Sequence, residues 1–221
     1  MGGFFGAISK KDVVLDIFFG VDYHSHLGTR RGGMIIYDDE KGFQRQIHNI
    51  ESTPFRTKFE NDIVNFRGNR GIGCISDTDP QPLLVRSHMG TYAICITGVI
   101  QNAEELIDRY LNLEGAHFEA MTGGGINGTE LVAALISRKE NFVDGIHFAH
   151  SLIDGTASIL ILKDDGSIIA ARDRFGRLPI HIGKRDDDSY AVSFESFAYQ
   201  KIGFEDAGGE AGVKHHVNLH R

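Results

Sequence analysis

The first six residues, Met1 to Gly6, constrain the fold most, because they form an uncharged terminus of glycine and phenylalanine. Chain termini usually fray unless a strand or a docked helix holds them. The apolar side chains of Phe4, Phe5 and Ala7–Ile8 predict a short buried strand, and the glycines let another backbone or a ligand approach it closely. We therefore expect the amino end in or beside a site, although an ordinary first strand has the same pattern.

The composition describes a globular chain with an acidic balance. It has 221 residues, of which 41% are hydrophobic, so it can bury a core as one large domain or as two small ones. The formal net charge of −7, without a basic run, argues against a nucleic-acid or anionic-membrane partner. No apolar run approaches the roughly 18 residues of a membrane span and the start lacks a signal-peptide pattern, so a cytoplasmic location is expected.

The sequence around the two cysteines does not indicate a disulfide, and the sequence around the first two histidines does not indicate a metal site. Cys74 and Cys95 lie in strand-like runs of a chain without a secretory signal, and we expect buried free thiols. His24 and His26 lie on a glycine-rich loop without cysteine or carboxylate partners at the spacing of metal ligands. No metal and no cofactor are therefore expected.

Hydrophobic periodicity predicts an alternation of strands and helices. Apolar spacings of three and four predict helices over residues 12–24, 102–113, 129–139 and 142–153. The first would follow a capping-box-like segment from Ser9 to Asp12, and Asn102 and Asn127 would each cap a helix with a glutamate three residues later. Strands are predicted near residues 3–8, 34–37, 43–50, 71–75, 83–85, 92–97, 158–163, 168–172, 180–183 and 190–194. Helices between two sets of strands predict sheets packed on each other with helices outside, not a doubly wound sheet.

Several short sequence blocks together indicate a protein family, because their order and spacing are more specific than any single block. They are Gly3-Phe4-Phe5-Gly6, Gly71-Ile72-Gly73, Gln81-Pro82, Gly98 with Asn102 to Leu106, and Asp164 to Asp173 with Gly176, Pro179 and Ile182-Gly183. Over about residues 1–205 this series resembles the class II glutamine amidotransferase domain of the amidophosphoribosyltransferase family. The resemblance implies an N-terminal-nucleophile hydrolase fold, an α+β, four-layer αββα sandwich of two antiparallel sheets between helices. Residues 206–221 lack periodicity, so we expect an irregular tail there and no phosphoribosyltransferase domain.

The resemblance also implies a chemistry, hydrolysis of glutamine to supply ammonia for purine-type synthesis. The family's nucleophile is a cysteine directly after Met1, whose own α-amino group serves as base. Here that position holds Gly2, and neither Cys74 nor Cys95 can lend a free α-amine. The family's oxyanion hole pairs an asparagine with the amide of the next glycine, and the matching residues are Thr97 and Gly98.

The residues that would hold the substrate are changed as well. The family arginine for the glutamine carboxylate falls near Ser76, beside Asp77, and the aspartate for the amino group aligns near Gly128. Arg30 or Arg31 is the candidate substitute for the missing arginine. The implied ligand is L-glutamine or a related small amino acid, and the implied partner is a phosphoribosyltransferase domain or subunit; a homo-oligomer stays open.

Two classes of function remain open from the sequence. The chain is either a glutamine amidotransferase whose nucleophile is replaced in this copy, or a non-catalytic descendant that binds an amino acid or a partner chain. In either case we expect Gly2, Arg30, Ser76, Thr97 and Gly98 to converge on one cleft.

Overall fold

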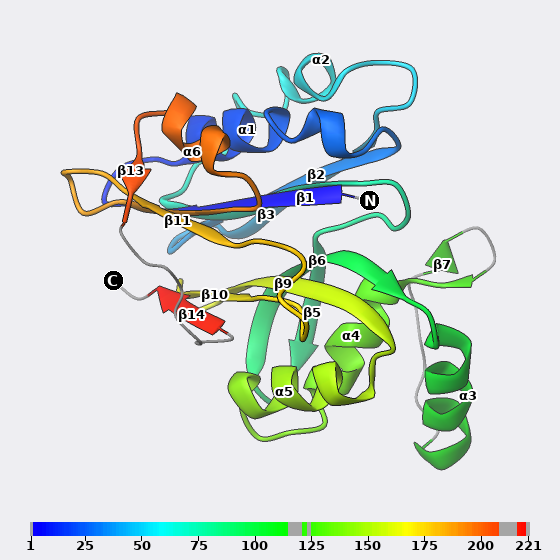
Figure 1. The fold of residues 1–221 in the computed structure, drawn as a ribbon. Coiled ribbons are helices and arrows are strands. Elements are labelled where there is room, and N and C mark those ends of the chain that lie inside the picture. The colour runs from blue at the N-terminus through cyan, green and yellow to red at the C-terminus, as the bar shows by residue number, and fades with distance from the viewer. Residues whose placement is uncertain (1, 115–120, 123–124, 208–215, 220–221) are drawn as a thin grey trace.

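Two antiparallel sheets face each other in the computed structural model, which describes residues 2–114, 121–122, 125–207 and 216–219 (Figure 1). The larger sheet has the strand order β13-β11-β12-β1-β4-β2-β3. Its strands are β1 (Gly2–Ile8), β2 (Arg31–Asp38), β3 (Gly42–Asn49), β4 (Arg70–Ser76), β11 (His181–Lys184), β12 (Tyr190–Ser193) and β13 (Glu205–Asp206). The predicted strand at the amino end is thus confirmed, and it lies in the centre of this sheet.

The smaller sheet has the order β14-β10-β9-β6-β5. Its strands are β5 (Leu83–Ser87), β6 (Gly90–Ile100), β9 (Gly155–Lys163), β10 (Ile168–Ala171) and β14 (His216–Leu219). A separate two-stranded ribbon joins β7 (Met121–Thr122) to β8 (Gly125–Ile126). The β9–β10 hairpin forms where the Asp165-Gly166 pair predicted a turn.

Helices cover the outer face of each sheet (Figure 1). The larger sheet carries α1 (Val14–Asp22), the short α2 (Phe55–Phe59) and α6 (Ser196–Lys201), with a 3-10 turn η1 at Ser25–Leu27. The smaller sheet carries α4 (Gly128–Ile136) and α5 (Phe142–Leu152), while α3 (Ala103–Glu114) lies at its end. The predicted four-layer αββα sandwich is confirmed. Among the described residues, no helix is both long and apolar enough to cross a membrane.

Strand β1 is buried on both faces, which explains its apolar sequence. Phe4 belongs to the core between the sheets, with Cys95 and Leu160, whereas Phe5 packs against Ile17 of α1. Successive side chains of a strand point to opposite faces, so a central strand of a covered sheet has no exposed side. Both phenylalanines have no exposed surface, and each contributes about 1.5–3 kcal/mol through burial.

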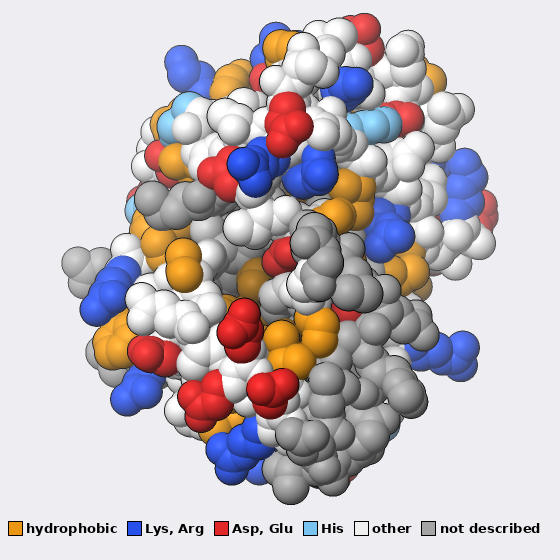
Figure 2. All heavy atoms as spheres, turned by 90° about the vertical axis from the view of Figure 1, so that its right-hand side faces the viewer, with side chains coloured by type: hydrophobic (Ala, Val, Ile, Leu, Met, Phe, Trp, Pro, Cys, Tyr) orange, Lys and Arg blue, Asp and Glu red, His pale blue; other side chains and the backbone are white. Residues whose placement is uncertain are grey.

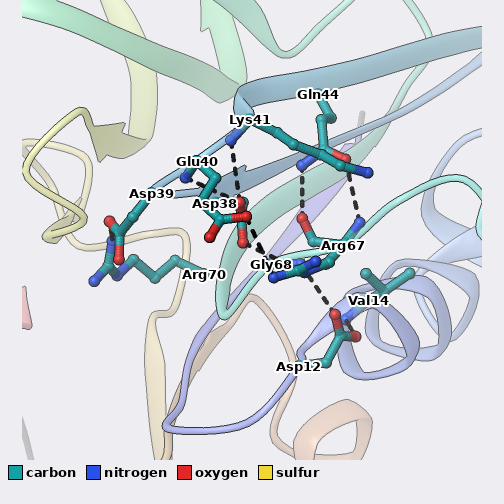
Figure 3. Close-up of polar contacts among 10 residues, drawn as sticks. All are labelled: Asp12, Val14, Asp38, Asp39, Glu40, Lys41, Gln44, Arg67, Gly68 and Arg70. Atoms are coloured by element: carbon teal, nitrogen blue, oxygen red, sulfur yellow. Dashed lines mark hydrogen bonds and ion pairs between the residues drawn. The ribbon is translucent and has the colours of Figure 1, made fainter.

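The start of α1 differs from the predicted capping box. The helix begins at Val14, whose amide donates to Asp12 Oδ1 at 2.9 Å, while Ser9 Oγ accepts from the Lys11 amide outside the helix. Asp12 Oδ2 also accepts from the Gly68 amide at 3.0 Å (Figure 3). The carboxylate therefore joins the helix start to the loop before β4, a contact that local spacing cannot reveal.

Residues 206–221 were expected to be an irregular tail, but part of this segment, His216–Leu219, forms strand β14. Strand β14 pairs with β10 in an antiparallel register that places Leu219 opposite Ile168 and His216 opposite Ala171. An edge strand presents unpaired backbone groups to any extended segment, so this pairing needs little side-chain signal. Residues 208–215 and 220–221 lie outside the described residues.

Candidate functional site

A cleft of about 330 Å³ opens at one end of the sandwich, between the two sheets. Gly2, Ser76, Thr97, Gly98 and Gly128 all line it, although they come from distant parts of the sequence. Figure 2 looks onto this end of the molecule, where the surface recedes between an upper and a lower half. The structure therefore brings together five of the predicted site residues.

The cleft continues the core between the sheets. Side chains alternate along each strand, so residues two apart face the same side. The inward-facing residues change from Phe4 to Gly2 along β1, from Cys74 to Ser76 along β4 and from Cys95 to Thr97 along β6. The apolar core thus gives way to small and polar side chains at this end, which leaves room for a ligand.

Gly2 lies against the backbone of β4, opposite Ser76. A Cβ atom added to Gly2 would lie 2.3 Å from the carbonyl oxygen of Ile75 and 3.3 Å from Cα of Ser76. Both neighbours are backbone atoms in a central strand, so they cannot swing away as a side-chain end can. A side chain at position 2 therefore requires β1 and β4 to move apart.

Thr97 and Gly98 form the opposite wall on β6. Gly98 has φ +152°, and a Cβ atom there would lie 2.0 Å from the carbonyl oxygen of Thr156, so the position requires glycine. The side chain of Thr97 is 3% exposed, and its Oγ1 has no hydrogen-bond partner within the described part of the chain. Buried polar atoms are nearly always satisfied, so this hydroxyl is a candidate ligand contact.

Ser76 and Asp77 have different surroundings. Ser76 Oγ accepts from the Thr78 amide at 3.1 Å within the cleft wall. Asp77 does not line the cleft; its Oδ1 accepts from the Thr29 amide at 2.7 Å. Burial raises the pKa of the Asp77 carboxyl, but hydrogen bonds and positive charges, among them the Thr29 amide and Arg30, together outweigh burial and leave this pKa below its usual range.

The two arginines do not join the cleft wall, contrary to the expected convergence of Arg30. The exposed Arg30 has its Nε 3.7 Å from Oε1 of Glu51. Arg31 pairs in register with Ser76, one strand farther from Gly2, and its Nη1 contacts the carbonyl oxygen of Arg30 at 3.4 Å. Neither is among the residues that line the cleft. Strand β2 begins at Arg31, and β4 separates β2 from β1, the strand that carries Gly2.

His24 lies beneath the first strand as a neutral core histidine. Its Nδ1 lies 2.6 Å from the carbonyl oxygen of Gly20, and its Nε2 lies 3.3 Å from Oγ of Ser193. Burial lowers the pKa of His24 to about 4. His26 instead pairs with Glu195 at 2.9 Å. Within the described ranges, no three His, Cys, Asp or Glu side chains are grouped to hold a metal ion.

Comparison with known proteins identifies the fold and the family. A family model described as the glutamine amidotransferase domain matches residues 69–199. This chain belongs to that family. An amidophosphoribosyltransferase of Methanocaldococcus jannaschii is 29% identical over 217 residues, which cover 93% of this chain and 44% of the relative.

Solved structures agree with this assignment. The glutamine phosphoribosylpyrophosphate amidotransferase from B. subtilis, complexed with ADP and GMP, has a TM-score of 0.78 and 26% identity. A structure described as the allosteric regulatory enzyme of purine biosynthesis has a TM-score of 0.79 and 25% identity. Each match covers 92% of this chain and 44% of the solved chain. The amidotransferase domain thus spans less than half the length of these relatives.

Sequence reasoning missed two residues of the amidotransferase domain's cleft, Asp79 and Gln81. The buried Gln81 amide donates to the Ile96 carbonyl at 3.1 Å and accepts from the Ile96 amide at 2.8 Å, which continues the β5–β6 ladder by a side chain. Asp79 Oδ2 accepts from the Gly128 amide at 2.9 Å. Asp79 lies in a run of turn-forming residues, and Gln81 was noted only within the Gln81-Pro82 block of the resemblance, without a role in the site.

Proposed function

We propose that this domain binds L-glutamine or a related carboxamide in the cleft and, with Gly2 in place, does not hydrolyse it. Family membership supports the ligand, and the cleft provides a concave site at the predicted residues. The observation that carries the proposal is the position of Gly2, which lines the cleft without a side chain and has no room for one.

Amide hydrolysis by this class of domain requires a nucleophile beside a base. The two cysteines of the chain do not supply one, because Cys74 and Cys95 are 1% and 0% exposed in the core between the sheets. Burial raises the pKa of the Cys95 thiol well above its usual range, and Cys74 beside it adds to the effect. Neither cysteine lines the cleft, and burial disfavours the reactive thiolate form of Cys95.

The partner follows from the relatives' names and lengths. The relatives are amidophosphoribosyltransferases more than twice as long as the matched segment, so we propose a phosphoribosyltransferase domain or subunit as the partner. In that assembly, glutamine binding to this domain regulates the partner, and the domain does not deliver ammonia. An active amidotransferase is the alternative, and the same assay distinguishes the two.

The test measures glutamine binding by calorimetry and glutamate release by a coupled assay. The parent is expected to bind L-glutamine and to release glutamate no faster than a no-protein control. Release above that control would show that a nucleophile other than residue 2 operates and would refute the proposed lack of hydrolysis.

Variants at position 2 separate the effect of the missing thiol from the steric effect of adding a Cβ atom. Gly2→Cys with Met1 removed is expected to restore only weak release, because Cβ meets the Ile75 carbonyl and Thr97 replaces the asparagine of the family's oxyanion hole, a donor worth about 3 kcal/mol. Gly2→Ala is the matched control, which adds the same Cβ without a thiol. Gly2→Cys combined with Thr97→Asn should release more than Gly2→Cys alone. Full turnover from Gly2→Cys alone would contradict the steric argument.

A further inference from the structure

The connection from β10 to β11 joins the smaller sheet to the larger one, and its backbone is fixed from the inside. Asp173 is 1% exposed; its Oδ1 accepts from the Phe175 amide at 3.0 Å and its Oδ2 from the Leu178 amide at 2.8 Å. The Asp173 amide donates to Ser158 Oγ of β9 at 3.1 Å. The exposed residues 174–177 therefore project from a rigid turn.

Two arginines and a phenylalanine form the exposed part of this turn, which we call the arginine loop. Phe175 is 53% exposed, and the Cζ atoms of Arg174 and Arg177 lie 5.4 Å and 4.7 Å from the centre of its ring. Arg56 and Arg70 pair with aspartates, but neither arginine of the loop has a carboxylate partner within the described part of the chain. Contact with the ring holds both guanidinium groups without neutralising them.

Helix α3 carries the opposite charge. Glu104, Glu105 and Asp108 are exposed in its first two turns, and Arg109 is the one basic residue of the helix. Among the residues that the structure describes, no ion pair joins these three carboxylates to the rest of the chain. A run of acidic residues on a helix is by itself an ordinary solvated face, so it becomes informative only beside a complementary surface.

The arginine loop and the start of α3 lie at the same end of the molecule as the cleft. Strand β10 runs towards this end, because Ala171 pairs with Ile159, next to Ser158, which lies opposite Thr97. The loop thus leaves the smaller sheet two strands from Thr97. Helix α3 follows β6 at the same end, where its first residue, Ala103, lines the cleft, and Figure 1 shows it standing out from the sandwich.

We propose that this end of the molecule binds a second copy of the chain, with the arginine loop of each copy docked on α3 of the other. A two-fold contact requires a surface that is complementary to itself, and a basic part beside an acidic part meets this condition. Phe175 supplies the apolar anchor, since aromatic residues and arginine are the types enriched at protein interfaces. The net charge of −7 opposes other orientations of two copies. The proposal does not depend on glutamine binding.

Sedimentation velocity of the intact chain over a concentration series tests the proposal. We expect the parent to form a reversible dimer whose fraction rises with concentration. Phe175→Ala should weaken this dimer about tenfold or more, as the loss of an interface anchor does. A parent that stays monomeric up to about 1 mM, a concentration at which even weak specific contacts are populated, would overturn the proposal.

An exchange of charges tests which surfaces meet. One variant combines Arg174→Glu with Arg177→Glu, and the other combines Glu104→Lys with Glu105→Lys. Each should associate about tenfold or more weakly than the parent, because its loop and its helix now carry like charges. An equimolar mixture should recover a dimer, because both loop–helix contacts again join opposite charges. Both variants keep a negative net charge, so general attraction does not explain a recovery. A mixture that stays monomeric, with thermal unfolding confirming that both variants are folded, overturns the pairing.

Two controls make matched changes away from these surfaces. Lys10→Glu with Lys11→Glu makes the same change of charge in the exposed turn beyond the Ile8 end of β1, opposite to the cleft end. Phe197→Ala removes another partly exposed phenylalanine, on α6. Both controls should dimerise as the parent does. Equal weakening in the controls would show that association follows net charge or surface hydrophobicity in general and would overturn the proposal.

Discussion

His24 couples the stability of the first strand to pH. The buried imidazole is neutral in the folded chain, with a pKa of about 4, and has a pKa near 6.5 when solvated. Between pH 6.5 and pH 4, His24 binds a proton in the unfolded chain but stays neutral in the folded chain, so acid favours unfolding. We expect the free energy of unfolding to fall by up to about 3 kcal/mol between pH 6.5 and pH 4 from this residue.

The measurement is urea unfolding of the parent and of His24→Gln across that pH range. Other groups titrate in the same range, so the comparison concerns the difference between the two proteins. The difference should shrink as the pH falls from 6.5 to 4. A difference that is independent of pH would show that His24 is not a buried neutral base.

Gly98 is expected to be the most sensitive glycine in the cleft wall. Gly98→Ala places a methyl group 2.0 Å from the Thr156 carbonyl at a positive φ, so β6 and β9 must separate. We expect a loss of stability of roughly 3 kcal/mol or more, as is typical of overpacking combined with backbone strain. Gly42→Ala is the control, because Gly42 also has positive φ but has nothing within 4 Å of the added Cβ; it should lose only about 1 kcal/mol. Equal losses in thermal or urea unfolding would contradict the packing argument.

At the scale of elements, the start of α4 links helix stability to ligand binding. Asn127→Ala removes the helix cap and the bond from Asn127 Nδ2 to the Pro80 carbonyl, next to Asp79. We expect a stability loss of about 1–2 kcal/mol and weaker carboxamide binding. Chemical unfolding and calorimetry measure the two effects.

The matched variant is Asn141→Ala. Asn141 caps α5 by accepting from the Asp144 amide at 2.9 Å, and it does not line the cleft. Its loss of stability should be similar, but ligand affinity should be unchanged. Similar losses of affinity in both variants would show that binding responds to stability in general and not to the Asp79 loop.

At the scale of the whole molecule, the two sheets must separate before the thiols can react. Cys74 and Cys95 are free and buried in the core between the sheets, which confirms the sequence expectation. We expect a thiol reagent such as DTNB to modify both cysteines of the native chain at the rate of global unfolding. In guanidinium, where the chain is unfolded, it should modify both rapidly. Fast modification of the native chain would contradict the closed packing of the sandwich.

Local sequence signals predicted most elements because they act over few residues. The apolar run from Phe4 to Ile8 specified a buried strand, the Asp165-Gly166 pair specified the β9–β10 turn, and Asn127 with Glu130 specified the start of α4. Such signals depend on side-chain period and on backbone groups within a few residues, so a single sequence contains them in full.

The tertiary structure decided where these elements meet. The sequence alone determined the strands, the helices and, through the order of its blocks, the family and the layered fold. It did not determine that Asp79 covers Gly128, 49 residues away, that Arg30 turns to Glu51, that His24 is buried under β1 or that β14 completes the smaller sheet. Those features come from the packing of one strand against another, which depends on space and desolvation across the whole fold and not on any neighbouring residue.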